Sequence, residues 1–296
     1  MAVGINRSAR VSLPAVQAGG GEDGVDRIER LETELLLEAV YQAHGADFRG
    51  YARPVLRQKL QALMQAGGIG TISALQDQVL RSPTHAEGLL RALSLRPAGL
   101  FDDASGVGQL RQTLCPYLRS CPLPKIWIAE STSAEDVFAL VILLIEEGLY
   151  DKTLIFVTAA DDMLLAETRL GAFPIARMAQ YDASYRASGG TGNLSDYCEQ
   201  RDDAMVFATQ LRRNLIWAQY NLVTDRSFNE FQFISCRRVL PEFGPSLRRR
   251  SLQLFADSLS PFGILGVDAA DELEAAPMAR QFQTVSRQHG LYRRIG

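Results

Sequence analysis

From residue 125 onward, short apolar segments alternate with helical segments, and this alternation constrains the fold more than any other feature. The apolar segments are KIWIA, TLIFVT, NLIWAQ, FQFISC and GILGV. The intervening segments include SAEDVFALVILLIEEGL, DMLLAETRLG and SLRRRSLQLFADSLS, which have helical spacing. Such alternation predicts a parallel sheet covered on both faces. Ligands of such sheets bind beyond the carboxyl ends of the strands, so we expect a site at the turns after Ala129, Thr158, Gln219 and Cys236.

Residues 25–105 lack this alternation and predict a small helical domain. Apolar residues recur at helical spacing between Ile28 and Val40, and Gly45 ends that segment. Three more helical segments follow, RPVLRQKLQALMQA, TISALQDQVLRS and PTHAEGLLRALS. Residues 1–24 have no periodicity, and we expect a flexible tail there.

Residues 106–296 are expected to form the α/β domain. The stretch YDASYRASGGTGNLSDYCEQ interrupts the alternation of strands and helices. It predicts a small inserted subdomain of short strands or loop at about residues 174–212.

Composition argues against several classes of function. The chain has 31 basic and 34 acidic residues, a net charge of −3, which gives no support for a nucleic-acid partner. Its three histidines lie far apart and its four cysteines lack paired spacing, so no metal site is expected. No apolar run is long enough to span a bilayer, so we expect no membrane insertion. Reduced cysteines and the absence of a secretory leader favour the cytoplasm.

Three stretches resemble the CheR type of chemotaxis receptor methyltransferase, a family that methylates receptor glutamates with S-adenosylmethionine. The start of that family's helical domain resembles LETELLLEAVYQAHGADFRGYARPVLRQKL. Its cofactor-binding half resembles KIWIAESTSAEDVFALVILLIEEGLYDKTLIFVTAADD, and its later strands resemble SFNEFQFISCRRVL. The resemblance implies an α/β, Rossmann-like S-adenosylmethionine methyltransferase fold with an N-terminal helical domain and a small inserted subdomain.

Several positions that the family uses for the cofactor carry other residues in this chain. In RPAGLFDD, Ala98 stands at a threonine and Asp102 at an arginine. In AESTSAED, Glu130 and Ala134 stand at two glycines. The strand TLIFVTA ends in Ala159, where the family has an aspartate.

A second group of positions lies in CRRVLPEF. Arg238 stands at the family's asparagine and Glu242 at its tyrosine. Other residues follow the family pattern and are the remaining candidates for contact with a cofactor: Glu135, Asp136, Asn221, Leu222 and Arg237.

These replacements oppose cofactor binding. Glu130 adds a side chain and a negative charge where glycine lets the backbone approach a ligand, and the cofactor's methionine end carries a carboxylate. Ala159 cannot accept hydrogen bonds from ribose hydroxyls, which are worth about 1.5–3 kcal/mol each with a charged acceptor. Asp161 follows two residues later, and a bulge in the strand would bring it to the same place.

The sequence therefore favours a catalytically inactive relative with no catalytic residue and no bound cofactor. We expect it to act as a regulatory or scaffold protein in bacterial signalling, through contact with a signalling protein or receptor. Arg53, Arg57 and Lys59 lie on the second helix, where the resemblance places receptor contacts. Arg53 and Arg57 share one helix face, so these residues are the expected partner-binding site.

Two alternatives stay open. The chain could be an active protein-glutamate methyltransferase that binds S-adenosylmethionine in an atypical site. The residues that still follow the family pattern support this alternative. Alternatively, the pocket is repurposed for another small ligand such as a signalling nucleotide. Arg96, Arg237 and Arg238 would then be the natural contacts for its phosphates.

Overall fold

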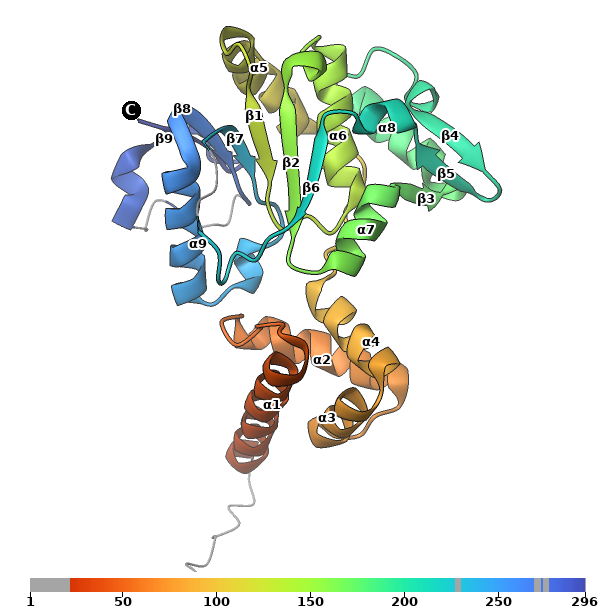
Figure 1. Cartoon of the computed structure of the whole chain (residues 1–296), viewed down its shortest axis with the longest axis vertical. Coiled ribbons are helices and arrows are strands. Elements are labelled where there is room, and N and C mark those ends of the chain that lie inside the picture. Colours follow the sequence, from red (N-terminus) through yellow and green to blue (C-terminus); the bar gives the residue numbers. More distant parts are fainter. Residues whose placement is uncertain (1–21, 227–229, 269–272, 274–276, 296) are drawn as a thin grey trace, which may run out of the picture.

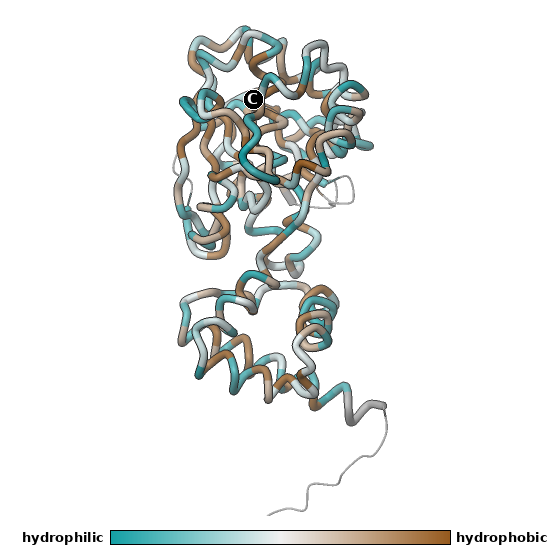
Figure 2. The backbone as a smooth tube through the Cα atoms, turned by 90° about the vertical axis from the view of Figure 1, so that its right-hand side faces the viewer, coloured by the Kyte–Doolittle hydropathy of each residue, from teal (hydrophilic) through white to brown (hydrophobic). Residues whose placement is uncertain are grey.

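The computed structural model describes residues 22–226, 230–268, 273 and 277–295. They form a helical N-terminal domain and a larger α/β domain, which follow one another along the long axis (Figure 1). In the side view, apolar and polar stretches alternate along the helices of the smaller domain, as amphipathic helices require (Figure 2).

The N-terminal domain contains the four helices that the periodicity predicts. They are α1 (Glu22–His44), α2 (Arg53–Gly67), α3 (Ile72–Arg81) and α4 (Pro83–Ser94). Gly45 and Gly68 follow α1 and α2 with φ of 72° and 65°, a left-handed conformation that glycine adopts without strain. Thr71 caps α3 by accepting a 3.1 Å hydrogen bond from the backbone N–H of Ala74. The expected tail lies largely outside the described residues, and α1 already begins at Glu22.

The α/β domain is built on a seven-stranded sheet in the order β6-β2-β1-β7-β8-β10-β9. Its strands are β1 (Lys125–Ile128), β2 (Leu154–Ala159), β6 (Leu215–Gln219), β7 (Phe231–Ser235), β8 (Leu259–Gly266), β9 (Phe282–Ser286) and β10 (Leu291–Arg294). The first five strands in that order pair in parallel, as predicted. The antiparallel pairing of β9 and β10 was not predicted.

Helices cover both faces of the sheet. They are α5 (Ala104–Ser120), α6 (Ala134–Glu146), α7 (Asp162–Leu170) and α9 (Pro245–Ser258). Leu114 of α5 and Val137 of α6 belong to a core cluster with Ile126 of β1. Phe255 of α9 belongs to a second cluster with Trp127, the next residue of the same strand. Because neighbouring strand residues point to opposite faces, this confirms the two-sided core.

The inserted subdomain contains a small antiparallel sheet and one unexpected helix. The sheet consists of β3 (Ala172–Pro174), β5 (Ala204–Phe207) and β4 (Cys198–Arg201). The prediction of strands or loop was wrong for the start of YDASYRASGG, because α8 (Met178–Ala187) covers it. Tyr181 and Tyr185 lie one helical turn apart and are both buried, a periodicity that the following glycines obscured.

The two domains are joined by a short backbone pairing. The backbone N–H of Ala52 donates to the carbonyl of Glu242, and that of Gly244 donates to the carbonyl of Gly50, both at 2.8 Å. The rings of Tyr51 and Phe243 meet edge to face between these bonds, 5.0 Å apart. The segment after β7 is therefore fixed against the N-terminal domain.

Candidate functional site

The carboxyl ends of β2, β1 and β7 lie side by side at the edge of the sheet that faces the N-terminal domain (Figure 1). This is the edge at which the sequence predicts a ligand site. Residues from the turns after these strands line three adjoining cavities.

Glu130 follows β1 and occupies the left-handed region, with φ of 53°. Only 5% of its surface is exposed. Its carboxylate accepts one hydrogen bond, a long one of 3.4 Å from the backbone N–H of Ala160. Burial raises the pKa of Glu130, and the positive charge of Arg96 opposes that rise. The turn therefore keeps a glycine-like backbone but places a poorly solvated acid there.

Arg96, which is buried, and the half-buried Glu242 and Lys59 form a set of ion pairs, called here the interdomain charge network. Nε and Nη2 of Arg96 lie 2.9 and 2.8 Å from Oε2 of Glu242. Nζ of Lys59 lies 2.7 Å from Oε1 of the same carboxylate. Burial lowers the pKa of Lys59, although Glu242 counteracts this. The network connects α2 and the segment after α4 to the segment after β7.

Little room is left between the ends of β1 and β7. The cavity there measures about 10 Å³, with Arg96 and Glu130 among its walls. A cavity called here the α5–α6 pocket adjoins it and measures about 470 Å³. A third cavity, the interdomain cleft, measures about 490 Å³ and is lined from both domains.

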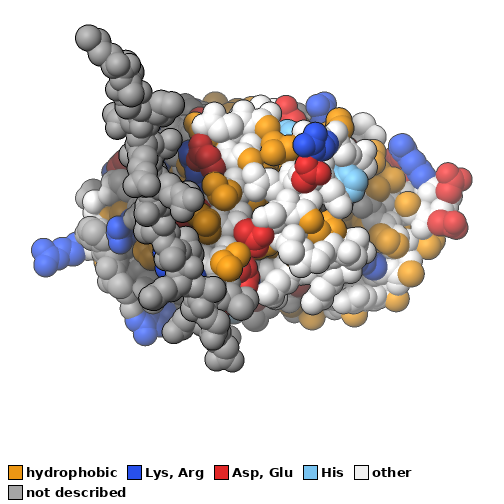
Figure 3. All heavy atoms as spheres, turned by 90° about the horizontal axis from the view of Figure 1, so that it is seen from below, with side chains coloured by type: hydrophobic (Ala, Val, Ile, Leu, Met, Phe, Trp, Pro, Cys, Tyr) orange, Lys and Arg blue, Asp and Glu red, His pale blue; other side chains and the backbone are white. Residues whose placement is uncertain are grey.

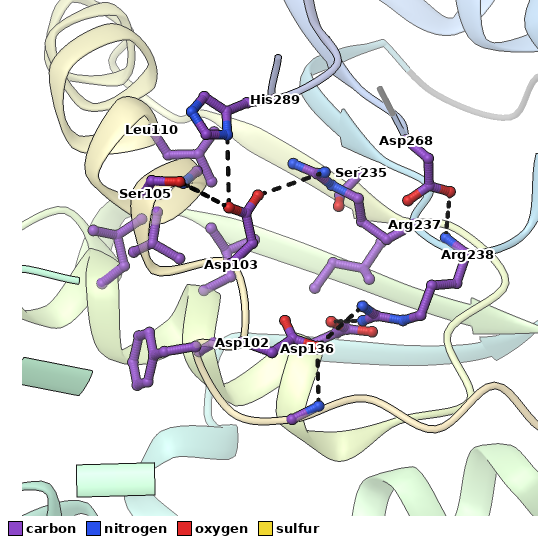
Figure 4. A pocket seen from close by; sticks show the side chains of 18 of the residues that line it. Asp102, Asp103, Ser105, Leu110, Asp136, Ser235, Arg237, Arg238, Asp268 and His289 are labelled. Atoms are coloured by element: carbon purple, nitrogen blue, oxygen red, sulfur yellow. Dashed lines mark hydrogen bonds and ion pairs between the residues drawn. The ribbon is translucent and has the colours of Figure 1, made fainter. Parts of the chain in front are cut away.

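The α5–α6 pocket contains an ion cluster centred on Arg238 (Figure 4). Nη1 of Arg238 lies 3.3 Å from Oδ2 of Asp102, and Nη2 pairs with Asp136. The backbone N–H of Arg238 donates a 2.6 Å bond to Asp268. Burial raises the pKa of Asp136, and the neighbouring Arg238 opposes this. The two departures from the family pattern, Asp102 and Arg238, are therefore partners of one another.

A second cluster in this pocket surrounds Asp103 (Figure 4). Oγ of Ser105 lies 3.3 Å from its carboxylate, Nδ1 of His289 lies 3.6 Å away and Nη1 of Arg237 lies 4.0 Å away. Ser105 donates to the acid and not to the imidazole. The arrangement is therefore not a nucleophile–base–acid relay.

Ala159 ends β2 and is fully buried, with only a methyl group to offer a ligand. The parallel register with β6 runs regularly through Ala159 and Gln219, so a bulge does not bring Asp161 back into the strand. Asp161 instead caps α7, accepting a 2.9 Å bond from the backbone N–H of Leu164.

The remaining residues that the sequence predicts at the cofactor site do not lie together in one cavity. Asn221 and Leu222 line the interdomain cleft, but Oδ1 of Asn221 accepts a 2.8 Å bond from Val223 within its own turn. Glu135 accepts hydrogen bonds from Tyr181 and Ser133, and it lines none of the three cavities. Ala98 is half-buried and also lies outside their walls.

Two residues of the network were not predicted as partners. Lys59, expected on a partner-binding surface, is only 19% exposed in its side chain, and its ammonium pairs with Glu242. In the sequence, Glu242 stands out only as a departure from the family pattern. Its distance from Arg96 in the sequence, 146 residues, leaves no local signal for the pairing.

Arg53 and Arg57 do lie on one exposed helix face, but both are already paired. Arg53 contacts Glu34 at 3.0 Å, and Arg57 contacts Asp26 and Glu29 at 2.8 and 2.6 Å. Seen from this end of the molecule, basic and acidic side chains are interspersed among apolar ones on the coloured surface (Figure 3).

Among the described residues, no group of three or more His, Cys, Asp or Glu side chains is placed to hold a metal ion. A search of the same residues finds no helix with the length and apolar character needed to cross a bilayer.

Comparison with known proteins gives two family matches. Residues 107–291 match the model described as CheR methyltransferase, SAM binding domain, and residues 31–94 match CheR methyltransferase, all-alpha domain. A relative in Pseudomonas putida, named "Putative methyltransferase Cher3", is 30% identical over 91% of this chain and 98% of its own length. A chemotaxis protein methyltransferase of Vibrio cholerae is 23% identical over 74% of this chain and 81% of its own length.

Among solved structures, an N-methyltransferase of Bradyrhizobium japonicum in complex with S-adenosyl-L-homocysteine aligns with a TM-score of 0.38. It is 11% identical and covers 70% of this chain and 97% of its own length. The family matches agree with the N-terminal helical domain and with the Rossmann-like domain described above. The chain belongs to the CheR methyltransferase family.

Proposed function

We propose that this CheR-family protein is catalytically inactive and acts as a regulatory or scaffold protein in bacterial signalling, without binding S-adenosylmethionine. The interdomain charge network carries the proposal. Arg96, which pairs with Glu242, lines the cavity between β1 and β7, and this cavity measures only about 10 Å³. A cofactor there would have to displace a buried ion pair, whose separation leaves uncompensated charges.

The fully buried Ala159, at the carboxyl end of β2, also supports the absence of cofactor binding. The family resemblance assigns an aspartate to this position for the ribose, and Asp161 is committed to capping α7. Asp102, at the position of an arginine, pairs with Arg238. The side chains present therefore do not fit the cofactor that the family uses.

Contact with a receptor or another signalling protein is the function that remains. Several relatives are named chemotaxis protein methyltransferases, which suggests a partner of that pathway. Arg53 and Arg57 are about half exposed, and their ion pairs with acidic residues of α1 could be replaced by ion pairs with acidic residues of a partner.

A second candidate is an active methyltransferase with an atypical site. Glu130 favours it, because its carboxylate reaches the backbone of Ala160 just past the end of β2. In that arrangement Glu130 would replace the missing aspartate at the ribose.

Calorimetry separates the two candidates. S-adenosylmethionine and S-adenosylhomocysteine are titrated into this protein and, as a positive control, into the Vibrio cholerae relative. We expect heat of binding only for the control. Micromolar binding of either compound to this protein would refute the proposal, and methyl transfer to a receptor fragment would then establish the second candidate.

A further inference from the structure

Three large apolar side chains form one exposed line along α1. Ile28, Leu31 and Leu35 are 63%, 56% and 52% exposed. They share one face, because residues three and four positions apart are neighbours on a helix surface. This set is called here the outer stripe. Single exposed apolar residues are normal on a protein surface, whereas a contiguous group of them marks a contact surface.

The outer stripe is separate from the face that holds α1 in the N-terminal domain. Leu36, Leu37 and Val40 are at most 1% exposed and belong to the core of that domain. A helix of a globular domain needs one apolar face for such packing. The first half of α1, which carries the stripe, extends away from the α/β domain (Figure 1). Packing within the described part of the chain therefore accounts for one apolar face of α1 and not for the other.

The spacing of the stripe is that of a helix–helix contact. Steps of three and four residues recur where two helices pack side by side along a common seam. The seam runs from Ile28 through Leu31 to Leu35, and the next position of the same spacing is Glu38. The stripe is therefore short and ends in a charged residue, which constrains the helix that can lie along it.

Opposite charges lie at the two ends of the stripe. Arg27 precedes it, is exposed, and forms no ion pair or hydrogen bond with another described residue. Glu38 lies about three turns further along the same flank of α1, and its side chain is 48% exposed. Its carboxylate contacts Arg49 at 2.9 Å, and an ionised carboxylate can accept from a second arginine as well.

These charges favour a second copy of α1 in antiparallel orientation. Two antiparallel copies place Leu31 of each opposite Leu35 of the other. Arg27 of each copy then lies next to Glu38 of the other, so both ends of the seam gain an attractive pair. Two parallel copies in register would instead place the Glu38 carboxylates against each other, which is repulsive.

An acidic partner fits this surface less well than a second copy does. Glu32 and Glu34 also lie on α1 beside the stripe. An acidic segment of the kind expected to meet Arg53 and Arg57 would therefore face like charges here, which disfavours contact.

We propose that the protein forms a symmetric dimer through the outer stripe, with the two α1 helices antiparallel. Each contact occurs twice in such a dimer, because the same patch of both copies is used. One pair of short helices buries less than the roughly 1,600 Å² of a standard interface, so we expect a reversible dimer that dissociates on dilution. The inference is independent of the proposed function, since an active and an inactive enzyme would present the same stripe.

Sedimentation of the full chain tests the proposal from about 1 to 100 μM, because association depends on protomer concentration. We expect a shift from monomer to dimer over this range. Leu31→Glu should weaken the dimer by about tenfold or more, because it places a charge in the seam of both copies. Leu123→Glu is the matched control: it adds the same charge at an apolar residue before β1 that is 73% exposed, and it should associate like the wild type.

A charge reversal tests the orientation. Arg27→Glu should weaken the dimer several-fold, and adding Glu38→Arg in the same chain should recover most of the loss. Neither Leu31→Glu nor Arg27→Glu should shift the melting curve of the dilute protein, because both residues are exposed and Arg27 has no partner among the described residues. Weaker association is then not a result of unfolding.

Disulfide formation gives a second test of the orientation, because bridged Cα atoms must lie within about 7 Å. A mixture of Leu31→Cys and Leu35→Cys chains should crosslink more readily than either variant alone, with the wild type and its four cysteines as background. The opposite result would show a parallel pair and overturn the arrangement. A chain that stays monomeric at 100 μM, or a dimer that Leu31→Glu leaves unchanged, overturns the proposal itself. The first of these results includes a stripe covered by residues 1–21 of the same chain.

Discussion

Replacing Glu242 by glutamine should destabilise the protein strongly, because the buried Arg96 and the half-buried Lys59 both depend on this one carboxylate. The exposed fractions of the side chains are 4% for Arg96, 14% for Glu242 and 19% for Lys59, so water screens the pairs little. Breaking a buried pair by removing one partner costs about 3–5 kcal/mol. Lys59 can release its proton, since burial already lowers its pKa, whereas Arg96 cannot. We therefore expect the lower end, about 3 kcal/mol.

For a chain of this size, about 3 kcal/mol corresponds to a fall in Tm of roughly 6 °C. Urea unfolding gives the free energy and calorimetry gives the Tm of Glu242→Gln. Glu34→Gln is the matched control, because it breaks the pair of Glu34 with Arg53, whose side chains are 50% and 48% exposed. Exposed pairs contribute at most about 1 kcal/mol. Equal losses in the two variants would refute the assignment of Glu242 as the centre of a buried network.

Three further outcomes are expected. Glu130→Gln should raise Tm at pH 8 and leave it unchanged at pH 3.5. Burial raises the pKa of Glu130 in the folded state above 4.5, its usual value in the unfolded chain. The ionised acid therefore destabilises the fold only at pH values above 4.5. Asp102→Arg alone should lower the free energy of unfolding, measured in urea, by about 0.5–1 kcal/mol, because it places a second positive charge beside Arg238. The double variant that also carries Arg238→Asn should recover most of this loss. Arg57→Glu should lower the Tm of the N-terminal domain slightly, because it faces two acids of α1, and an unchanged melting curve would contradict those pairs.

The sequence predicts the framework well because hydrophobic periodicity is a local property. The strands β1, β2 and β7 are continuous apolar runs between helices, as strands buried on both faces should be. Gly68 and Thr71 mark helix ends through their own conformational preferences. The family resemblance added the identity of the fold.

The contents of the site could be predicted only in part. Ala159 and Glu130 are visible as departures in single positions, and the structure places both at the sheet edge. Pairings between distant residues carry no periodic signal, so the partner of Arg96 could not be predicted. For the same reason, the helix pattern alone does not predict that Glu242 lies beside Lys59.

The pattern of replacements favours repacking of the site over gradual decay. Random loss of cofactor contacts would leave buried charges without partners, and each would cost several kcal/mol. Instead Asp102 pairs with Arg238, and Glu242 pairs with both Arg96 and Lys59. Glu130 follows the same rule, since it is buried beside this network and the positive charge of Arg96 opposes the rise of its pKa by burial. The negative charge of Glu130 therefore offsets part of the two positive charges that share Glu242.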